Sequence, residues 1–395
     1  MFFLGTWVYN ESTGLDQISG LPIHSSMYKS LKTNLPKEVM AFPDYPFAAT
    51  VKGNIKDQSF LHHRDVLAYL EKFAVDHKLF PHIRFNTLVK GISHEPEKNP
   101  AWNVTVQDMR SGKVKSHLYQ AVMVCNGHYS EPSIPDLPGI ESFDGLIMHS
   151  HDYRTPQAFE GKTVAVLGAA ASGSDIGLEI ASVAKRLYLC HNNPLIPSKL
   201  PENFSQKKGI EAIVGKNCLR LADQSCIEDV EVLLFCTGYH YSFPFLDSKI
   251  CPRVENRVVW PLYKHMIHID YPQLCFIGIP IQICPFPQFD LQVRLFVKTL
   301  TGDLVLPGKE EMLADTQHEM ETKLRAGVAQ RHFHKMGAAQ WDYNRSLCQI
   351  AQLESIPLSV EKLYNDVHEH RRHHLTTYKN QSYQLSLSTG SYERK

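Results

Sequence analysis

A glycine-rich turn is the feature of this sequence that could most clearly bind a ligand. Gly168, Ala170 and Gly173 occupy the three glycine positions of a G-x-G-x-x-G pattern, between a strand-like stretch and a helix-compatible stretch. In that pattern the first glycine permits the tight turn, the second lets the backbone approach a pyrophosphate, and the third lets the helix pack closely on the strand. The methyl group of Ala170 leaves less room for the backbone to approach a pyrophosphate. The free backbone amides at the start of the helix, beside Ser172, still favour binding of a phosphate group. The pattern predicts a dinucleotide site, and a purely structural strand-turn-helix is the alternative.

The stretch after this turn bears on which nicotinamide cofactor binds. An NAD site needs an acidic residue about 20 residues after the first glycine, at the end of the next strand, to bind the ribose hydroxyls. Here the next strand-like stretch ends at Cys190 and is followed by His191, with Lys199 further on and no acid at the strand end. A 2′-phosphate would meet no repulsion there, so the sequence favours NADPH over NADH. Taken singly, His191 and Lys199 could equally be solvated surface residues.

The elements that must position this turn alternate between strands and helices. Strands are expected at 83–89, 102–107, 121–125, 164–167, 187–190 and 230–235, and helices at 62–78, 171–184, 290–300, 309–326 and 360–372. The β-α-β order from residue 162 onward predicts a parallel sheet. The strand at 121–125 runs into a loop at Gly127, where a ligand could dock. The prolines before residue 156 indicate a connection between two units, whereas 241–290 is expected to be irregular.

Composition and charge argue against several classes of function. Lys plus Arg and Asp plus Glu both number 41 in 395 residues, so no net charge attracts nucleic acid or an acidic membrane. Nine cysteines without a C-x-x-C pair argue for free thiols in a reducing compartment and against a disulfide framework or a metal site. No stretch reaches the ~20 apolar residues of a membrane-spanning helix, and no signal peptide is evident. We expect a cytoplasmic protein, with peripheral association at the endoplasmic reticulum as the alternative; the oligomeric state stays open.

A second pattern lies just before the glycine-rich turn. Phe143, Gly145, His149 and Tyr153 fit the pattern F-x-G-x-x-x-H-x-x-x-[YFW], and this stretch resembles the signature of flavin-dependent monooxygenases. In that family the signature forms the hinge between an FAD domain and an NADPH domain. The resemblance therefore implies a structural and conformational role for His149 and no role as a general base. Taken alone, a histidine is most often a satisfied interior or surface group.

Three further segments resemble the same family, most closely its insect-like branch. Residues 28–47 are similar to its long segment near the flavin, and 235–239 to its F-A-T-G-Y signature. Residues 276–278, with 285–292, are similar to the strand and helix that return to the flavin. Together with the hinge pattern, these segments extend the resemblance over most of the chain.

The resemblance implies an α/β fold with two Rossmann-like nucleotide-binding domains, of which the FAD domain is discontinuous. Residues 1–156 would form the first part of the FAD domain and 157–240 the NADPH domain. Residues 241–395 would form the second part of the FAD domain together with the C-terminal helices. The residues expected at the cofactors are Gly5, Thr6, Trp7, Thr33, Gly127, Gly168, Ala170, Ser172, Gly173, His191, Lys199, Thr237, Gly238 and Gln292.

The resemblance also implies an enzyme of the N,N-dimethylaniline monooxygenase type, active in xenobiotic metabolism with FAD, NADPH and O2. NADPH reduces the flavin, O2 adds at its C4a position, and the hydroperoxide gives its distal oxygen to a soft amine or sulfide. The protein orients the cofactor and substrate and excludes water from the site. Asn34 is the candidate active-site residue, because a carboxamide can donate a hydrogen bond to the flavin peroxide without offering a titratable proton. Its alternative role is that of a turn residue ahead of Pro36.

Two other functions stay open at this point. A Baeyer–Villiger monooxygenase is disfavoured by Tyr153, because the hinge pattern of those enzymes usually ends in Trp or Phe. The other is a non-catalytic protein that retains NADP binding. The family opens with its own G-x-G-x-x-G and later Gly-Gly-x-Trp, whereas the first match here is that last element, Leu4-Gly5-Thr6-Trp7. We therefore expect an FAD domain that lacks its first βαβ piece, with weak FAD affinity and reduced stability.

Overall fold

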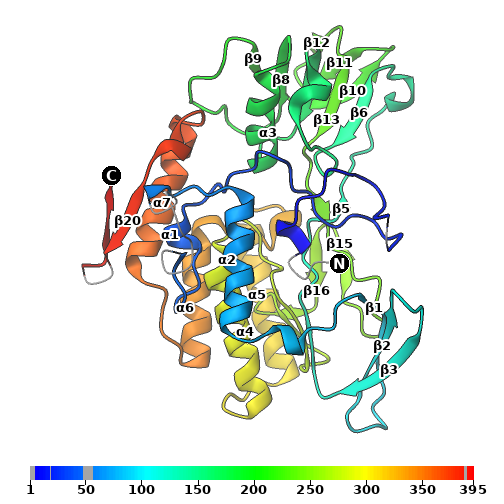
Figure 1. Cartoon of the computed structure of the whole chain (residues 1–395), viewed down its shortest axis with the longest axis vertical. Coiled ribbons are helices and arrows are strands. Elements are labelled where there is room, and N and C mark those ends of the chain that lie inside the picture. The colour runs from blue at the N-terminus through cyan, green and yellow to red at the C-terminus, as the bar shows by residue number, and fades with distance from the viewer. Residues whose placement is uncertain (1–4, 18, 48–56, 387–388) are drawn as a thin grey trace.

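The chain folds into two units that lie one above the other in Figure 1. The computed structural model describes residues 5–17, 19–47, 57–386 and 389–395, so Leu4 of the N-terminal pattern lies outside the described residues. The upper unit contains a parallel sheet from the middle of the chain. The lower unit contains the N-terminal segment, most of the helices and the remaining sheets.

A five-stranded parallel sheet forms the centre of the upper unit. Its strand order is β6-β13-β7-β8-β9. The strands are β6 (Leu146–His149), β7 (Thr163–Leu167), β8 (Arg186–Cys190), β9 (Phe204–Lys207) and β13 (Val232–Phe235). Helix α3 (Ala171–Ala181) connects β7 to β8 and packs Ile176 and Ile180 against one face of the sheet. The predicted β-α-β order is confirmed, and the apolar residues on both strand faces are typical of a sheet covered on both sides.

A small antiparallel sheet covers the other face of this parallel sheet. It consists of β10 (Ile210–Val214), β11 (Cys218–Leu221) and β12 (Cys226–Ile227), with β12 at its edge. Leu219 and Leu221 of β11 belong to the same buried cluster as Ala165 and Leu233 of the parallel sheet. The sequence predicted none of these three strands, because strands this short show too little alternation to be recognised.

The lower unit is built from several short sheets. In a four-stranded sheet, β4 (Val122–Val124) pairs in parallel with β19 (Leu274–Phe276), followed by β18 (Ile267–His268) and β17 (Leu262–Tyr263). The other pairings are β1 (Thr87–His94) with β2 (Trp102–Asp108) and β3 (Val114–Tyr119), β5 (Glu131–Pro132) with β14 (Tyr239–His240), β15 (Arg253–Glu255) with β16 (Val258–Trp260), and β20 (Tyr383–Ser386) with β21 (Ser391–Arg394).

Two sequence expectations for this region were wrong. The stretch 241–290 is not irregular, because β15 to β19 lie within it. Each of these strands has only two or three residues and is defined by its partner strand, not by its own periodicity. The strand expected at 83–89 begins later, at Thr87, because Phe80–His82 forms a short 3-10 helix before it.

The helices of the lower unit enclose two apolar cores. They are α1 (Lys37–Met40), α2 (His63–Asp76), α4 (Pro285–Thr301), α5 (Lys309–Arg325), α6 (Gln340–Ala351) and α7 (Leu358–His373). One core joins α1, α2 and α7 through Val39, Tyr69 and Leu363, and the other joins α4 and α6 through Leu295 and Leu347. The predicted helices at 62–78, 309–326 and 360–372 are confirmed, whereas α6 was not predicted and α4 begins earlier than expected.

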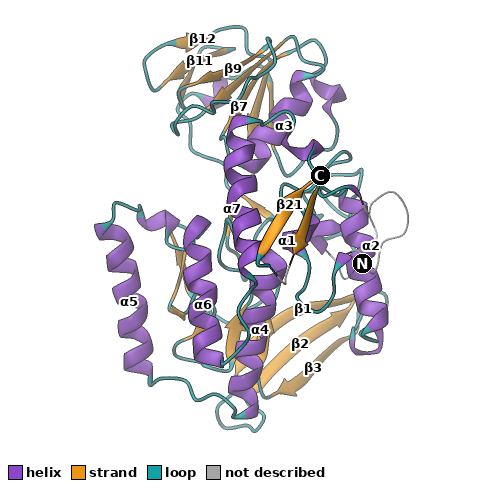
Figure 2. Ribbon diagram, turned by 90° about the vertical axis from the view of Figure 1, so that its left-hand side faces the viewer, coloured by secondary structure: helices purple, strands orange, loops and turns teal. Residues whose placement is uncertain are grey.

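Charged side chains attach the C-terminal helix to the upper unit. Figure 2 shows α7 extending to the level of α3. The carboxylate of Asp175 in α3 lies 3.4 Å from Arg371 Nη2 of α7 and 2.8 Å from Lys379 Nζ. The Lys379 ammonium also donates to the carbonyl of Lys32 at 3.1 Å. Lys379 therefore joins the C-terminal segment both to α3 and to the N-terminal segment at Lys32.

The parallel sheet takes its first strand from before the boundary that the sequence suggested at residue 156. β6 belongs to the hinge pattern and pairs in parallel with β13. The hinge pattern is therefore part of the upper sheet itself. None of the described helices is long and apolar enough to cross a membrane.

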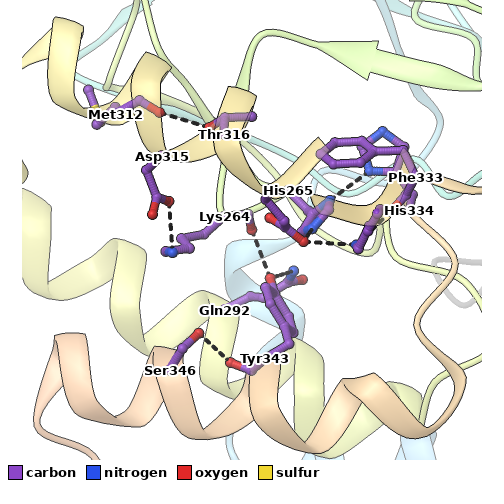
Figure 3. A network of polar contacts seen from close by, with 12 residues as sticks. Lys264, His265, Gln292, Met312, Asp315, Thr316, Phe333, His334, Tyr343 and Ser346 are labelled. Carbon is purple, nitrogen blue, oxygen red and sulfur yellow. Dashed lines mark hydrogen bonds and ion pairs between the residues drawn. The ribbon is translucent and has the colours of Figure 1, made fainter. Parts of the chain in front are cut away.

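A buried pair of histidines, His265 and His334, joins the β17–β18 turn to the segment after α5 (Figure 3). The Val259 amide donates to His334 Nε2 at 2.9 Å, so the proton of a neutral His334 must be on Nδ1. That Nδ1–H donates to His265 Nδ1 at 2.8 Å, which leaves His265 Nε2–H to donate to Glu319 at 2.9 Å. Burial lowers the pKa of both histidines. Lys323 Nζ lies 2.8 Å from the Glu319 carboxylate and ends this series of hydrogen bonds near the surface.

We expect the protein to lose stability on acidification from pH 7 to pH 5. His265 and His334 have folded-state pKa values below their ordinary 6.5, so below that pH the unfolded chain binds protons that the folded chain excludes. The loss should approach about 1.4 kcal/mol per pH unit for each excluded proton. Urea unfolding of the wild type at several pH values measures it. A His334→Gln variant should show a shallower slope, and wild-type stability that stays constant or rises towards pH 5 would contradict the prediction.

Candidate functional site

The glycine-rich turn lies at the carboxyl end of β7, where the chain order of the sheet reverses. From β7 the chain passes through α3 to β8 on one side, while β13 lies on the other side. Such a switch point is where open α/β sheets bind ligands. Gly168 has a φ of +109°, and a Cβ there would stand 2.5 Å from the carbonyl oxygen of Cys236, just after β13. The turn therefore lies against the end of the neighbouring strand.

Gly173 lets α3 approach the strand closely. A Cβ on this residue would stand 1.8 Å from the carbonyl oxygen of Gly168, a contact that no side chain could make. Ala170 is the N-cap residue of α3, and no side chain caps the helix. The first amides of the helix therefore have no intrahelical acceptor. Ala170 and Ser172 are both exposed, so the open side of the turn is accessible.

The residues expected near the ribose differ in their surroundings. The Gly168 amide donates to the carbonyl of Cys190 at 2.9 Å, which places the end of β8 beside the turn. His191 follows directly but is buried, and its Nε2 lies 3.1 Å from Gln206 Oε1. Lys199 is exposed. Of the two candidate residues, Lys199 thus offers a solvent-accessible cation, while His191 packs within the upper unit.

The end of β13 is braced by a residue that the sequence did not reveal. Arg257 Nη2 donates to the carbonyl of Thr237 at 2.8 Å and to Ser133 Oγ at 2.9 Å. The Thr237 hydroxyl donates to the carbonyl of Ser133, and the Gly238 carbonyl accepts from the Ser133 amide at 2.9 Å. Thr237 and Gly238 are therefore positioned by the segment that crosses between the units. Arg257 lies in the turn between β15 and β16 and had no motif to mark it.

Three residues of the hinge pattern have packing roles. A Cβ on Gly145 would stand 2.4 Å from the Glu231 carbonyl oxygen and 2.6 Å from the Phe143 ring, so only glycine fits under that ring. Phe143 is buried in the cluster between the two upper sheets. Tyr153 is buried in the apolar cluster between α3 and the parallel sheet, called the α3 core below, where its ring centroid lies 5.4 Å from that of Tyr28. The pattern thus connects the upper sheet with the N-terminal segment.

The geometry of His149 supports a structural role. Its Nδ1 accepts from the His151 amide at 3.0 Å, so its proton is on Nε2, which donates to the Gly238 carbonyl at 3.1 Å. Burial lowers its pKa to about 4, so the ring is neutral near pH 7. Both nitrogens are occupied by backbone groups. His149 therefore links the end of β6 to the loop after β13.

In the lower unit, the N-terminal segment and the loop after β4 meet at His24. Ideal Cβ atoms on Gly5 and Gly127 would stand 3.4 Å and 3.9 Å from its imidazole ring. The carbonyl of Thr6 accepts from the Ser25 hydroxyl at 2.8 Å. Nothing in the sequence marked His24, because its position depends on how these two segments pack.

Trp7 and Asn34 lie beside the core formed by α1, α2 and α7. Trp7 packs against this core, with its ring centroid 6.4 Å from that of Phe286. The Thr33 amide donates to the Leu61 carbonyl at 2.8 Å, and its hydroxyl accepts from the Leu61 amide at 3.0 Å. Asn34 is half-buried in a bend before α1. Its side-chain carboxamide has no hydrogen-bond partner within the described part of the chain. The bend agrees with the turn role that the sequence offered as the alternative.

Gln292 is fully buried, and both its amide oxygen and its amide nitrogen make hydrogen bonds; Figure 3 shows the bond to Tyr343. Its Oε1 accepts from the Gly278 amide at 3.1 Å, and its Nε2 donates to the Tyr343 hydroxyl at 2.8 Å. Tyr343 in turn donates to the carbonyl of Lys264 at 2.8 Å. Gln292 thus positions the loop at Gly278, with one N–H directed to Tyr343.

The residues around the β7–α3 turn fit a nicotinamide dinucleotide. Gly168 and Gly173 form a cradle that Cβ atoms would fill, next to uncapped helix amides. The fit to FAD is partial. Gly5, Gly127 and Asn34 could lie along a flavin, but the described ranges contain no second glycine-rich turn between a strand and a helix. They likewise contain no group of three side chains suited to a metal ion.

Comparisons with known proteins relate the chain to flavin enzymes. A family model described as flavin-binding monooxygenase-like matches residues 7–199 and 192–366. The flavin-containing monooxygenase FMO GS-OX-like 4 of Arabidopsis thaliana is 34% identical over 98% of this chain and 88% of its own length. FMO GS-OX5 of the same plant is 36% identical over 92% of this chain and 80% of its own length.

Solved structures show the same relation. The S-allyl-L-cysteine S-oxygenase from Allium sativum has a TM-score of 0.88 and 34% identity, over 96% of this chain and 87% of its own. Tmm from Pelagibacter sp. has a TM-score of 0.84 and 28% identity, over 98% of this chain and 86% of its own. A cyclohexanone monooxygenase, at 13% identity and a TM-score of 0.59, is similar in fold alone. The expected α/β class with two Rossmann-like domains is confirmed.

We expect Gly173→Ala to weaken NADPH binding at least tenfold. The new methyl would collide with the Gly168 carbonyl and push the helix amides away from the turn. Overpacking of this kind costs about 1–3 kcal/mol, and tenfold in affinity corresponds to about 1.4 kcal/mol. Titration followed by NADPH fluorescence measures the change. Gly91→Ala is the control, because its Cβ would meet open space; equal affinities of the two variants would remove the turn from the binding site.

Proposed function

The chain belongs to the flavin-binding monooxygenase-like family, and from that premise we propose that it is an NADPH- and O2-dependent monooxygenase acting on soft sulfur or nitrogen centres. The observation that carries the proposal is the close-packed turn at Gly168 and Gly173, located at the switch point of a parallel sheet. Its accessible helix amides suit a pyrophosphate. The exposed Lys199, with no acid at the end of β8, favours a 2′-phosphate over a free ribose hydroxyl.

An enzyme of this kind needs few chemically reactive side chains, because its cofactor carries out the reaction. Bound FAD supplies the electron and oxygen chemistry, and the chain binds, orients and excludes water. Asn34 stands where the chain crosses between the cores, because Leu31 packs on the α3 core and Leu35 on the α1–α2–α7 core. Its free carboxamide can donate a hydrogen bond at this boundary without adding a titratable proton.

The preferred substrate class is a thioether, with a tertiary amine as the second choice. The relative that supports a thioether is the Allium protein named S-allyl-L-cysteine S-oxygenase. A soft nucleophile needs few specific contacts, in agreement with the absence of paired catalytic carboxylates from the motifs of the sequence. A ketone substrate is less well supported, because Tyr153 ends the hinge pattern where Baeyer–Villiger enzymes usually have Trp or Phe.

We expect the purified protein, incubated with FAD, to show flavin absorption and to oxidise NADPH faster when an alkyl aryl thioether is added. Sulfoxide should form in step with the additional NADPH consumed. Chromatography and NADPH absorbance measure both quantities, and Gly173→Ala is the matched inactive variant. A colourless protein that still binds NADPH would instead support the non-catalytic function. A lactone formed from a cyclic ketone, without sulfoxide, would support the Baeyer–Villiger function.

We expect Asn34→Ala to reduce sulfoxide formation at least tenfold while NADPH affinity stays the same. The variant removes a hydrogen-bond donor, and loss of one such donor to a developing charge costs about 2.7–4 kcal/mol in other enzymes. NADPH consumption should continue with less product per turnover. Asn380→Ala, at an exposed position near the C-terminus, serves as the control. Unchanged sulfoxide yield in Asn34→Ala would leave this residue only its role in the bend.

A further inference from the structure

Two cysteines share the outer face of the small antiparallel sheet in the upper unit. The register pairs Leu219 with Ile227 and Arg220 with Cys226. Leu219 and Ile227 are buried, so the alternate residues Cys218, Arg220 and Cys226 point outward. Cys218 is therefore a diagonal neighbour of Cys226 on the same face of the sheet.

The two thiols are near enough for Cys226 to affect the ionisation of Cys218. Burial, a hydrogen bond with the Cys226 thiol and the nearby charge of Glu228 together raise the pKa of Cys218. Both residues are free thiols, and Cys226 is exposed while Cys218 is half-buried. Five of the other cysteines, Cys190, Cys236, Cys275, Cys284 and Cys348, are buried. An oxidant from solvent therefore reaches Cys226 more readily than its neighbour or those five thiols.

We propose that Cys218 and Cys226 form a reversible disulfide in response to hydroperoxides, with Cys226 reacting first. The Cys226 thiolate attacks the peroxide, the O–O bond breaks, and the sulfur becomes a sulfenic acid as hydroxide leaves. Cys218, as its thiolate, then attacks that sulfur and displaces the second oxygen. In total, two thiols and one H2O2 give one disulfide and two water molecules. Disulfides of reducing compartments are typically transient and redox-sensing, as this one would be.

The position of β12 makes closure of this bond feasible. Diagonal neighbours have Cα atoms about 7–8 Å apart, whereas a disulfide needs about 4.4–6.8 Å, so one strand must shift slightly. β12 has only two residues, lies at the edge of its sheet and follows a four-residue turn from β11. A short edge strand can make such a shift without disturbing the buried strands.

The cysteine pair lies just before β13, the strand whose carboxyl end lies against the dinucleotide turn. Residues 228–231 lead from β12 directly into β13, and the carbonyl of Cys236 after β13 contacts Gly168. The bond would therefore tie the hairpin that precedes β13. Formation of the disulfide is independent of whether the chain oxygenates sulfides, so it can be tested separately.

Mass spectrometry of the intact, native chain tests the proposal. The protein is treated with equimolar H2O2, unfolded, alkylated with iodoacetamide and digested with trypsin. Cleavage after Arg220 separates the two cysteines, so the disulfide would join peptide 217–220 to peptide 221–249. We expect this linked pair, lighter by two hydrogen atoms than the two peptides together, to appear with peroxide and vanish after reduction by a phosphine.

Two variants test the order of the steps. In Cys218→Ser the reaction should stop at the sulfenic acid of Cys226, which dimedone captures. In Cys226→Ser, dimedone capture of a sulfenic acid at Cys218 should be at least severalfold lower than its capture at Cys226 in Cys218→Ser. Fragment spectra of the wild-type linked pair must place the bond at Cys226 and not at the buried Cys236 in the same peptide. A bond at Cys236, sulfinic acid at Cys226 beside a free Cys218, or no oxidation of either thiol would each overturn the proposal.

Discussion

The close approach of three backbone segments around Gly168 constrains the rest of the upper unit. The Gly168 carbonyl lies where a side chain of Gly173 would begin, and its α-carbon faces the Cys236 carbonyl after β13. This approach places the start of α3 between the ends of β7 and β13. The accessible amides, the braced Thr237 and the end of β8 then converge on one edge of the sheet. Packing thereby positions a site that has few polar side chains of its own.

The boundary between the two units combines apolar contacts, in which Leu178, Ile196 and Leu200 of the upper unit pack against the α1–α2–α7 core, with backbone contacts and charge pairs. The segment around Thr33 leaves the α3 core at Leu31 and enters the α1–α2–α7 core at Leu35. His149 joins the end of β6 to Gly238 as a neutral donor and acceptor. Asp175 joins α3 to the C-terminal segments. These contacts join the upper unit, which holds the dinucleotide turn, to the segment that carries Asn34.

Buried polar groups give the lower unit a defined geometry. Gln292, Tyr343 and the His265–His334 pair are each bonded to backbone groups, so they determine where loops run and leave few free donors. A scaffold of this kind agrees with the proposed function, in which a bound cofactor supplies the chemistry. Burial of His265 and His334 lowers their pKa values and favours their neutral forms.

The sequence by itself determined the local features. The glycine spacing from Gly168 to Gly173, the β-α-β order around it and the hinge pattern from Phe143 to Tyr153 were all recognisable. Each depends on backbone conformation or periodicity over a short stretch. Only the tertiary structure decided which distant segments meet. The brace by Arg257, the meeting of Gly5 and Gly127 at His24, the burial of Gln292 and the short strands between 253 and 276 all depend on pairing between residues far apart in the chain, and no local pattern encodes that pairing.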